Sequence, residues 1–288
     1  MLSGVVLIDK PTGMTSHDVV AQLRKKLSEK KIGHAGTLDP FASGLLVMGI
    51  GSGTKLLHHL FGLDKQYLAT IRLGQSTTTD DLEGEITSEA FAGDVTIQQI
   101  KENIKNLTGS IQQVPSSVSA IKIEGKRAYE LAREGKEVVI PARSVEVYHF
   151  QPTSDLRRIG DFVEFDVSVD CSSGTYIRAL ARDLGATLGV GGHLRALRRT
   201  RIGEFSISDA TTVENVQEPK SLLEVANRIF PLIELTPEQA QDIVHGKRVN
   251  LASETVVAAS YQNRLLAIME PVGQNYRSVT VFPEAFNG

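Results

Sequence analysis

One acidic side chain, Asp39, lies in a loop whose other residues are mostly small. Residues 33–44 read GHAGTLDPFASG, with three glycines, one proline and Asp39 as the one charge. Glycines let a bulky planar ligand approach the backbone closely, because they carry no Cβ. An isolated carboxylate in such a loop can act as a nucleophile or a base. The alternative interpretation is structural, since an aspartate before a proline commonly stabilises a turn.

Two other kinds of site receive little support from the residues around Asp39. No Gly-Lys-Ser or Gly-Lys-Thr closes the loop, so it lacks the ending of a phosphate-binding loop. A hydrolase with an aspartate nucleophile would need a second acid or base, and no other carboxylate stands at a telling spacing. The seven histidines, which include the neighbours His58 and His59, offer no ligand set. The sequence therefore predicts no metal site.

Composition narrows the class of protein. The 288 residues are 41% hydrophobic and 23% charged, with a net charge of −3, which permits a local basic face but not a chain that is basic all over. The sequence has no run of about 18 apolar residues, so it predicts no membrane span. The first residues lack the basic region of a signal peptide. A single cysteine, Cys171, excludes an intramolecular disulfide. We therefore expect a cytoplasmic protein.

The elements that would position Asp39 can be assigned from periodicity. Residues 15–31 predict a helix, in which Thr15 and Asp18 have the spacing of a capping box. Residues 95–110 predict an amphipathic helix that ends at Gly109. Residues 171–189 predict a turn followed by a helix. The predicted strands are residues 5–8, the apolar run from Leu45, residues 65–74 with Tyr67 on the inner face, and residues 161–169.

The character of the chain changes near Pro231. Thr236, Pro237 and Gln239 predict the start of a capped helix that stops at Gly246, and three short strand-like runs follow it. This pattern indicates a small β-rich module. Strands and helices of the main body do not alternate in strict β-α-β order, so the fold class is α+β rather than doubly wound.

The loop around Asp39 resembles the signature Gly-His-X-Gly-X-Leu-Asp-Pro-X-Ala-X-Gly of the bacterial tRNA pseudouridine synthases of the TruB family. Further segments resemble blocks of that family in the same order, and the resemblance covers roughly residues 3–235. Several motifs in the right order are far more specific than one. These segments are GVVLIDKPTGMTSHD, GTKLLHHLFGLDKQYLATIRLGQSTTTDDLEG, SAIKIEGKRAYELAREG, SSGTYIRALARDLG and GGHLRALRRTRIGEF.

The resemblance implies a pseudouridine synthase fold, with a mixed, mostly antiparallel sheet flanked by helices and loops. It implies a catalytic domain at 1–230, with an insertion near 112–145 that grips RNA, and a PUA-like RNA-binding domain at 231–288. The implied reaction converts uridine to pseudouridine at position 55, in the TΨC loop of tRNA, without a cofactor. Asp39 would be the nucleophile on a flipped-out uridine, for which Gly36 and Gly44 make room. Whether it attacks the base or the ribose stays open.

The resemblance also implies partners for Asp39. Arg178 would pair with it, and a nearby guanidinium lowers a carboxyl pKa by roughly 1–3 units and fixes its orientation. Tyr67 would stack on uracil and help to move the C5 proton. Tyr176 is a weaker substrate-binding candidate. The alternatives are a surface arginine for Arg178 and core packing for the two tyrosines.

Other family positions are implied to bind the substrate. His34 would stack in the RNA loop where the flipped base had been, unless it only bonds the backbone. Asp81 would contact the nucleotide or fix its loop, although Asp80 beside it leaves the assignment uncertain by one residue. Lys10 and Lys55 would position the loop or a phosphate, and the alternative is that both are solvated.

Three basic segments predict the RNA surface, because they stand out in a slightly acidic chain. In RALRRTR, helical spacing would place Arg195, Arg198 and Arg199 on one side. The other two segments are LRKKLSEKK and KIEGKRAYELAREGK. One departure from the family concerns the insertion, where Pro115 is followed by Ser116 instead of a second proline.

Two functions compete at this stage, besides the hydrolase. The leading hypothesis is a stand-alone, monomeric isomerase whose partner is the TΨC stem-loop of tRNA. The other is a non-catalytic RNA-binding or RNA-folding protein, which would not need the set Asp39, Tyr67 and Arg178.

Overall fold

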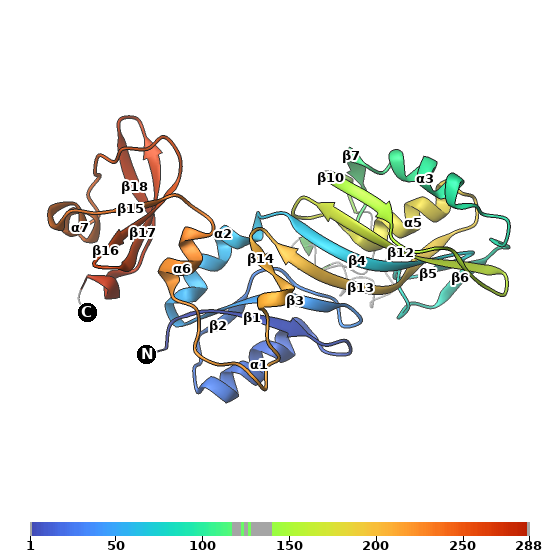
Figure 1. Cartoon of the computed structure of the whole chain (residues 1–288), viewed down its shortest axis with the longest axis horizontal. Coiled ribbons are helices and arrows are strands. Elements are labelled where there is room, and N and C mark those ends of the chain that lie inside the picture. The colour runs from blue at the N-terminus through green and yellow to red at the C-terminus, as the bar shows by residue number, and fades with distance from the viewer. Residues whose placement is uncertain (1, 117–121, 124–125, 128–139, 287–288) are drawn as a thin grey trace.

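The computed structural model describes residues 2–116, 122–123, 126–127 and 140–286, and Figure 1 shows the arrangement of its elements. Most of the insertion expected near 112–145 lies outside these residues. The described part of that insertion includes the end of β7 (Gly109–Gln113) and the short pair β8 (Lys122–Ile123) and β9 (Lys126–Arg127).

A ten-stranded sheet forms the main body, with its principal strands in the order β1-β3-β13-β4-β12-β10-β7. Its pairs are antiparallel except β13 with β3, so the expected mixed, mostly antiparallel sheet is confirmed. The strands besides β7 are β1 (Gly4–Lys10), β2 (Ile32–His34), β3 (Ser43–Ile50), β4 (Lys65–Leu73), β10 (Arg143–Pro152), β11 (Arg157–Ile159), β12 (Phe162–Cys171), β13 (Gly192–Ile202) and β14 (Phe205–Ser206).

The helices begin where the sequence supplies caps. Thr15 and Asp18 close a capping box at α1 (Ser16–Leu27), as their spacing predicts, and α3 (Ile97–Lys105) has the same kind of cap. α3 ends at Lys105, so the expected end at Gly109 is wrong, because Gly109 already begins β7. The remaining elements of the main body are η1 (Gly51–Leu56), α2 (Leu57–Phe61), β5 (Gln75–Thr77), β6 (Ile86–Glu89), α5 (Ile177–Thr187), η2 (Ile207–Asp209) and α6 (Leu222–Asn227).

One core cluster of the main body lies between the sheet and α3 and α5, which cover one of its faces (Figure 1), and a second packs α1 against β1 and β3. β4 and β12 alternate strictly, as predicted, and turn their apolar residues inward. Ile71 on β4 is 1% exposed, whereas Leu68 on the other face is 45% exposed. At β4 and β12 one face of the sheet is thus packed and the other carries mostly polar side chains, whereas β1 and β3 are buried on both faces.

The C-terminal part is the β-rich module that the sequence predicts. Its four-stranded sheet consists of β15 (Leu232–Glu234), β16 (Val257–Tyr261), β17 (Arg264–Val272) and β18 (Asn275–Val281), and it is accompanied by α7 (Pro237–Val244) and η3 (Pro283–Ala285). One hydrophobic cluster runs from β1 and β3 through α6 into this sheet, where Leu265 and Ile268 on β17 belong to it. The two parts are therefore packed together near α2 and α6 (Figure 1).

None of the helices within the described ranges has the length and apolar character that crossing a bilayer requires.

We predict that Ile71→Ala lowers the free energy of unfolding by about 2–5 kcal/mol, because it removes a fully buried side chain and leaves a cavity. Leu68→Ala on the same strand is the matched control, and we expect it to change that free energy by no more than about 0.5 kcal/mol. Denaturant unfolding of the two variants measures the difference. Equal losses would contradict the assignment of the two faces.

Candidate active site

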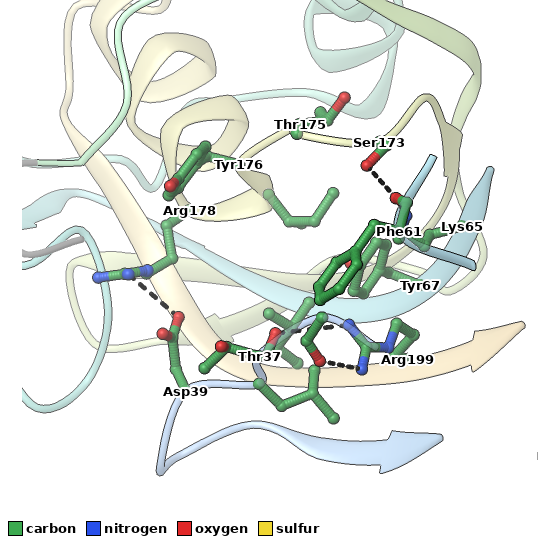
Figure 2. A pocket seen from close by; sticks show the side chains of 15 residues that line it. Thr37, Asp39, Phe61, Lys65, Tyr67, Ser173, Thr175, Tyr176, Arg178 and Arg199 are labelled. Atoms are coloured by element: carbon green, nitrogen blue, oxygen red, sulfur yellow. Dashed lines mark hydrogen bonds and ion pairs between the residues drawn. The ribbon is translucent and has the colours of Figure 1, made fainter. Parts of the chain in front are cut away.

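A cavity of about 280 Å³ opens beside Asp39 (Figure 2). Its walls come from the loop after β2, the end of α2, β4, the turn before α5 with the first residues of that helix, and β13. Six of the residues singled out in the sequence line it: Gly36, Asp39, Tyr67, Tyr176, Arg178 and Arg199. The other four, Lys10, His34, Lys55 and Asp81, are not among its lining residues.

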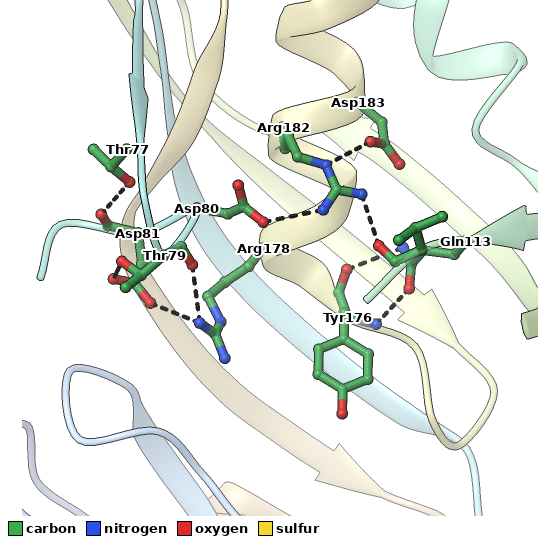
Figure 3. Close-up of polar contacts among 10 residues, drawn as sticks. Thr77, Thr79, Asp80, Asp81, Gln113, Tyr176, Arg178, Arg182 and Asp183 are labelled. Carbon is green, nitrogen blue, oxygen red and sulfur yellow. Dashed lines mark hydrogen bonds and ion pairs between the residues drawn. The ribbon is translucent and has the colours of Figure 1, made fainter. Parts of the chain in front are cut away.

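Arg178 is shared between two carboxylates. Its Nη2 lies 3.1 Å from Oδ2 of Asp39, and its Nη1 lies 3.1 Å from Oδ2 of Asp81. Nη1 also donates to the carbonyl oxygen of Thr79 at 2.9 Å (Figure 3). The side chains of Arg178 and Asp81 are 6% and 4% exposed, whereas that of Asp39 is 36% exposed. Arg178 is therefore fixed on its buried side by Asp81 and Thr79, and Asp39 is the carboxylate that is accessible from the cavity.

Asp81 serves this arrangement as an anchor. Its Oδ1 accepts hydrogen bonds from Oγ1 of Thr79 and from the backbone N–H of Glu83. Of the two roles expected for Asp81, fixing a loop is the one its contacts fit. The neighbouring Asp80 has a positive φ of 60° and pairs with Arg182 instead, at 3.1 Å. The assignment of Asp81 over Asp80 thus agrees with the geometry at Arg178.

The pKa of Asp39 is raised above its usual value, chiefly because the carboxyl group is withdrawn from water. Arg178 opposes this effect, and the charge of Asp81 reinforces it. The sequence predicts a lowered pKa for Asp39, and this prediction is wrong for the net shift. The contact with Arg178 does lower the pKa, but the effect of burial is larger. Because a third of the side chain still meets solvent, the withdrawal from water is incomplete.

The start of α5 is fixed by a residue that sequence reasoning missed. Gln113 at the end of β7 accepts from the backbone N–H of Tyr176 at 2.8 Å and donates to its carbonyl oxygen at 3.1 Å (Figure 3). Tyr176 is the N-cap of α5, so these two hydrogen bonds fix the start of the helix and with it the position of Arg178, two residues later. The guanidinium of Arg143 lies 5.8 Å from the centre of the Tyr176 ring, within reach of a cation–π contact.

Arg199 supports the loop that carries Asp39. Its Nη2 donates to the carbonyl of Gly36 at 3.0 Å, and its Nε donates to the carbonyl of Leu45 at 2.9 Å. The side chain is fully buried. The predicted helical spacing of RALRRTR is wrong, because this segment lies in β13. Strand alternation turns Leu197 and Arg199 toward the cavity, which helical spacing could not show.

The other arginines of that segment are engaged in ion pairs on the sheet. Arg198 pairs with Asp9 at 2.6 Å and Arg201 pairs with Asp170 at 2.7 Å. Arg195 lies 3.5 Å from Glu164. These pairs offset much of the positive charge on which the predicted RNA surface rested in this segment.

Lys10 holds the same loop from the opposite side. Its Nζ donates to the carbonyl of Met14 at 2.6 Å and to that of Pro40 at 3.4 Å. Burial lowers the pKa of Lys10 to about 8. Ser16 adds two bonds to the backbone of Leu38, at 2.9 and 3.1 Å. Of the two roles expected for Lys10, loop positioning is the one these contacts fit.

Gly44 is needed for strand packing. Its φ is +106°, and a Cβ there would lie 2.3 Å from the carbonyl oxygen of Arg199. The expectation that Gly44 makes room for a nucleotide is therefore wrong, because the space beside its Cα is occupied by the backbone of β13. Gly36, with a φ of +90°, does line the cavity.

Tyr67 lies buried in the cavity wall, on β4 opposite Arg199. Burial raises the pKa of its hydroxyl, although the Arg199 guanidinium opposes this effect, so the phenol keeps its proton near pH 7. Lys65, two residues earlier on the same face, also lines the cavity and was missed. The period-two pattern of this strand was the signal that could have found it.

His34 and Lys55 lie apart from the cavity lining. His34 is on β2, where burial lowers the pKa of its imidazole and favours the neutral ring. Lys55 donates to the carbonyl of Val281 at 2.8 Å and lies 5.4 Å from the centre of the Phe282 ring. Lys55 thus joins η1 to the C-terminal sheet, which differs from the phosphate or loop role expected for it.

No group of three or more His, Cys, Asp or Glu side chains within the described ranges is placed to hold a metal ion.

Solved structures share the overall fold of this chain. The structure titled "Crystal Structure of a Cbf5-Nop10-Gar1 Complex" has a TM-score of 0.69 and 26% identity, covering 97% of this chain and 84% of that one. A second, titled "Structure of H/ACA RNP bound to a substrate RNA containing 2'-deoxyuridine", has the same TM-score at 24% identity, which supports the fold alone.

Sequence comparison identifies the family. Residues 24–177 match "TruB family pseudouridylate synthase (N terminal domain)", residues 178–227 match "tRNA pseudouridylate synthase B C-terminal domain", and residues 230–283 match "tRNA Pseudouridine synthase II, C terminal". The chain belongs to the TruB family. Two relatives called tRNA pseudouridine synthase B, from Leifsonia xyli subsp. xyli and Corynebacterium efficiens, are each 50% identical. They cover 98% and 97% of this chain, which covers 97% and 95% of them.

We predict that Asp39→Asn raises the melting temperature at pH 7. A carboxyl whose pKa is raised on folding contributes stability that is complete at low pH and is lost as the pH rises through that pKa. The amide does not ionise, so the gap from the wild type should close as the pH falls below the pKa of Asp39. Thermal unfolding from pH 4 to 8 measures this, with Asp94→Asn as an exposed control. A lower melting temperature at pH 7 would contradict the raised pKa.

Proposed function

We propose that the protein isomerises uridine to pseudouridine at position 55, in the TΨC loop of tRNA, with Asp39 as the nucleophile on a flipped-out uridine. The observation that carries the proposal is the placement of Asp39 in the cavity. Its carboxylate is held by the anchored guanidinium of Arg178 and remains open to a ligand. Family membership supplies the reaction class, and the relatives' printed names supply tRNA as the substrate.

The chemistry needs an ionised carboxylate against the nucleotide. Asp39 adds either to C6 of the base or to C1′ of the ribose, and the bond between N1 and C1′ breaks. The detached base turns so that C5 faces C1′, and a C5–C1′ bond forms. If Asp39 is bonded to C1′, formation of the C5–C1′ bond displaces it; if it is bonded to C6, it leaves C6 afterwards. The proton then leaves C5, and N1 gains a proton. No atoms are gained or lost overall, so the reaction is an isomerisation.

Arg178 keeps Asp39 reactive where burial works against it. Withdrawal from water and the charge of Asp81 both favour the protonated acid, and Arg178 favours the anion. The guanidinium also fixes the carboxylate, because its own position is set by Asp81 and the carbonyl of Thr79. A less hydrated anion held in one orientation is a better nucleophile than a solvated one.

Tyr67 would serve the base in two ways. Its buried ring provides an apolar surface in the cavity on which a pyrimidine stacks. Its hydroxyl, which keeps its proton near pH 7, takes up the C5 proton only by passing its own proton on. Tyr67 is therefore a relay in this proposal rather than a phenolate base.

His34 would fill the gap that the flipped uridine leaves in the RNA loop. Extruding a base costs a few kcal/mol, and stacking on an aromatic ring returns about 1–3 kcal/mol per base. The neutral imidazole favoured by burial suits stacking rather than phosphate binding.

The proposal extends to the organisation of the chain. Residues 1–230 would form the catalytic domain, with the insertion near 112–145 gripping the TΨC stem-loop, and residues 231–288 would form a PUA-like RNA-binding domain. The contact of Lys55 with Val281 and the hydrophobic cluster shared with α6 support a fixed relation between the two domains. The enzyme would act as a cytoplasmic monomer.

We predict that Asp39→Asn abolishes pseudouridine formation and leaves tRNA binding measurable, because the amide cannot act as a nucleophile. Mapping of modified uridines in unmodified tRNA treated with each enzyme tests this, with Asp94→Asn as the control that keeps activity. Turnover at the wild-type rate by Asp39→Asn would refute the role of Asp39. Modification at another uridine would refute only the assigned position.

We predict that Arg178→Lys lowers kcat about 100-fold, because a lysine keeps the charge but loses the fork that spans Asp39 and Asp81. Arg182→Lys, one turn later on α5, is the matched control and should stay close to the wild type. Single-turnover rates on a TΨC stem-loop RNA provide the measurement. A wild-type rate for Arg178→Lys would show that orientation by this residue is unimportant.

A further inference from the structure

One aromatic side chain in the cavity, Phe61, has no part in a hydrophobic core. It is 47% exposed and lines the cavity together with Lys65 and Tyr67. It does not belong to any of the hydrophobic clusters formed by the residues that the structure describes. Full burial of a phenyl ring would contribute roughly 1.5–3 kcal/mol to folding, and Phe61 forgoes much of it. The ring is thus available to a ligand.

The backbone at Phe61 is clamped from two sides. Its carbonyl oxygen accepts a hydrogen bond from Nζ of Lys65 at 2.8 Å and another from Oγ of Ser173 at 2.5 Å. Lys65 also donates to the carbonyl of Leu63 at 2.5 Å, so its ammonium group faces backbone oxygens. The end of α2 is therefore tied both to β4 and to the turn that precedes α5. A ring presented on a fixed backbone loses little conformational freedom when a ligand arrives.

The position of Phe61 indicates which ligand group it meets. In Figure 2, Asp39 and Arg178 lie at one side of the cavity, and Phe61, Lys65 and Tyr67 lie at the other. The group that enters this cavity and reaches Asp39 is the target nucleotide. Its planar pyrimidine is what an exposed phenyl ring in such a wall packs against best.

We propose that Phe61 is a base-stacking residue for the target uridine, and that Lys65 and Ser173 are positioning residues that fix its ring at the cavity wall. The inference rests on the proposed function, because it takes the occupant of the cavity to be a uridine. Stacking of a base on an aromatic side chain contributes about 1–3 kcal/mol.

The first test compares kcat/KM on a TΨC stem-loop RNA. Phe61→Ala should lower it about 5- to 150-fold, which corresponds to the loss of one stacking contact. Phe61→Tyr keeps a ring and should retain most of the efficiency. Phe91→Ala removes an even more exposed phenyl ring that is not part of the cavity lining, and it should behave as the wild type. A Phe61→Ala enzyme as efficient as the wild type overturns the proposal.

The second test asks what the ring touches. In an Asp39→Asn background, which cannot turn over, binding is measured to a stem-loop with uracil at the target position and to one with an abasic site there. Phe61→Ala should weaken binding of the uracil RNA and leave binding of the abasic RNA unchanged. Equal losses on both RNAs would mean that the ring contacts another part of the substrate, which also overturns the proposal.

The third test concerns the clamp. Ser173→Ala should lower kcat/KM when Phe61 is present and have no further effect in a Phe61→Ala background, because it acts through the ring. Effects that add in full would refute the positioning role. Failure of the proposed function is separable from these outcomes. A wild-type enzyme that forms no pseudouridine in the stem-loop refutes that function, whereas an active wild type with an unaffected Phe61→Ala refutes this inference alone.

Discussion

The site depends on one guanidinium that is shared between an exposed and a buried carboxylate. Arg178 is held by Asp81 and by the carbonyl of Thr79 in the protein interior, and its other nitrogen meets Asp39 at the cavity. The Arg178–Asp81 pair is buried, and removing one partner of such a pair costs about 3–5 kcal/mol. The result is a carboxyl group whose pKa is raised by burial and lowered by Arg178, and whose side chain is still partly exposed at the cavity.

The surrounding fold also fixes the position of Asp39, because it immobilises the loop that carries this residue. Arg199 bonds the loop from β13, and Lys10 bonds it from the end of β1. Gly44 lets β3 approach β13 closely enough for Arg199 to reach the loop. Two side chains that the sequence predicts to bind RNA, Arg199 and Lys10, therefore support from the interior the loop that carries Asp39. The cost of burying these two cations can be offset by the positioning of the proposed nucleophile.

Local pattern was sufficient for much of the fold. The capping box of α1, the alternation of β4 and the helix after residue 171 all appear where the sequence predicts them. Long-range geometry was not accessible, because the partner of Gly44 is set by a strand contact distant in sequence. Helical spacing misplaced Arg199 for the same reason. The net pKa direction of Asp39 depends on burial, which one sequence does not display.

The central claim, that Arg178 lowers the pKa of Asp39 against the effect of burial, can be measured directly. Carbon-13 NMR titration of the aspartate carboxyls, with Asp39 assigned from its absence in Asp39→Asn, gives the pKa in the free protein. We expect a value above the usual aspartate pKa of 3.8, and a still higher value in Arg178→Met, where the two carboxylates lose their shared cation. A pKa of Asp39 that does not change when Arg178 is removed would contradict the account.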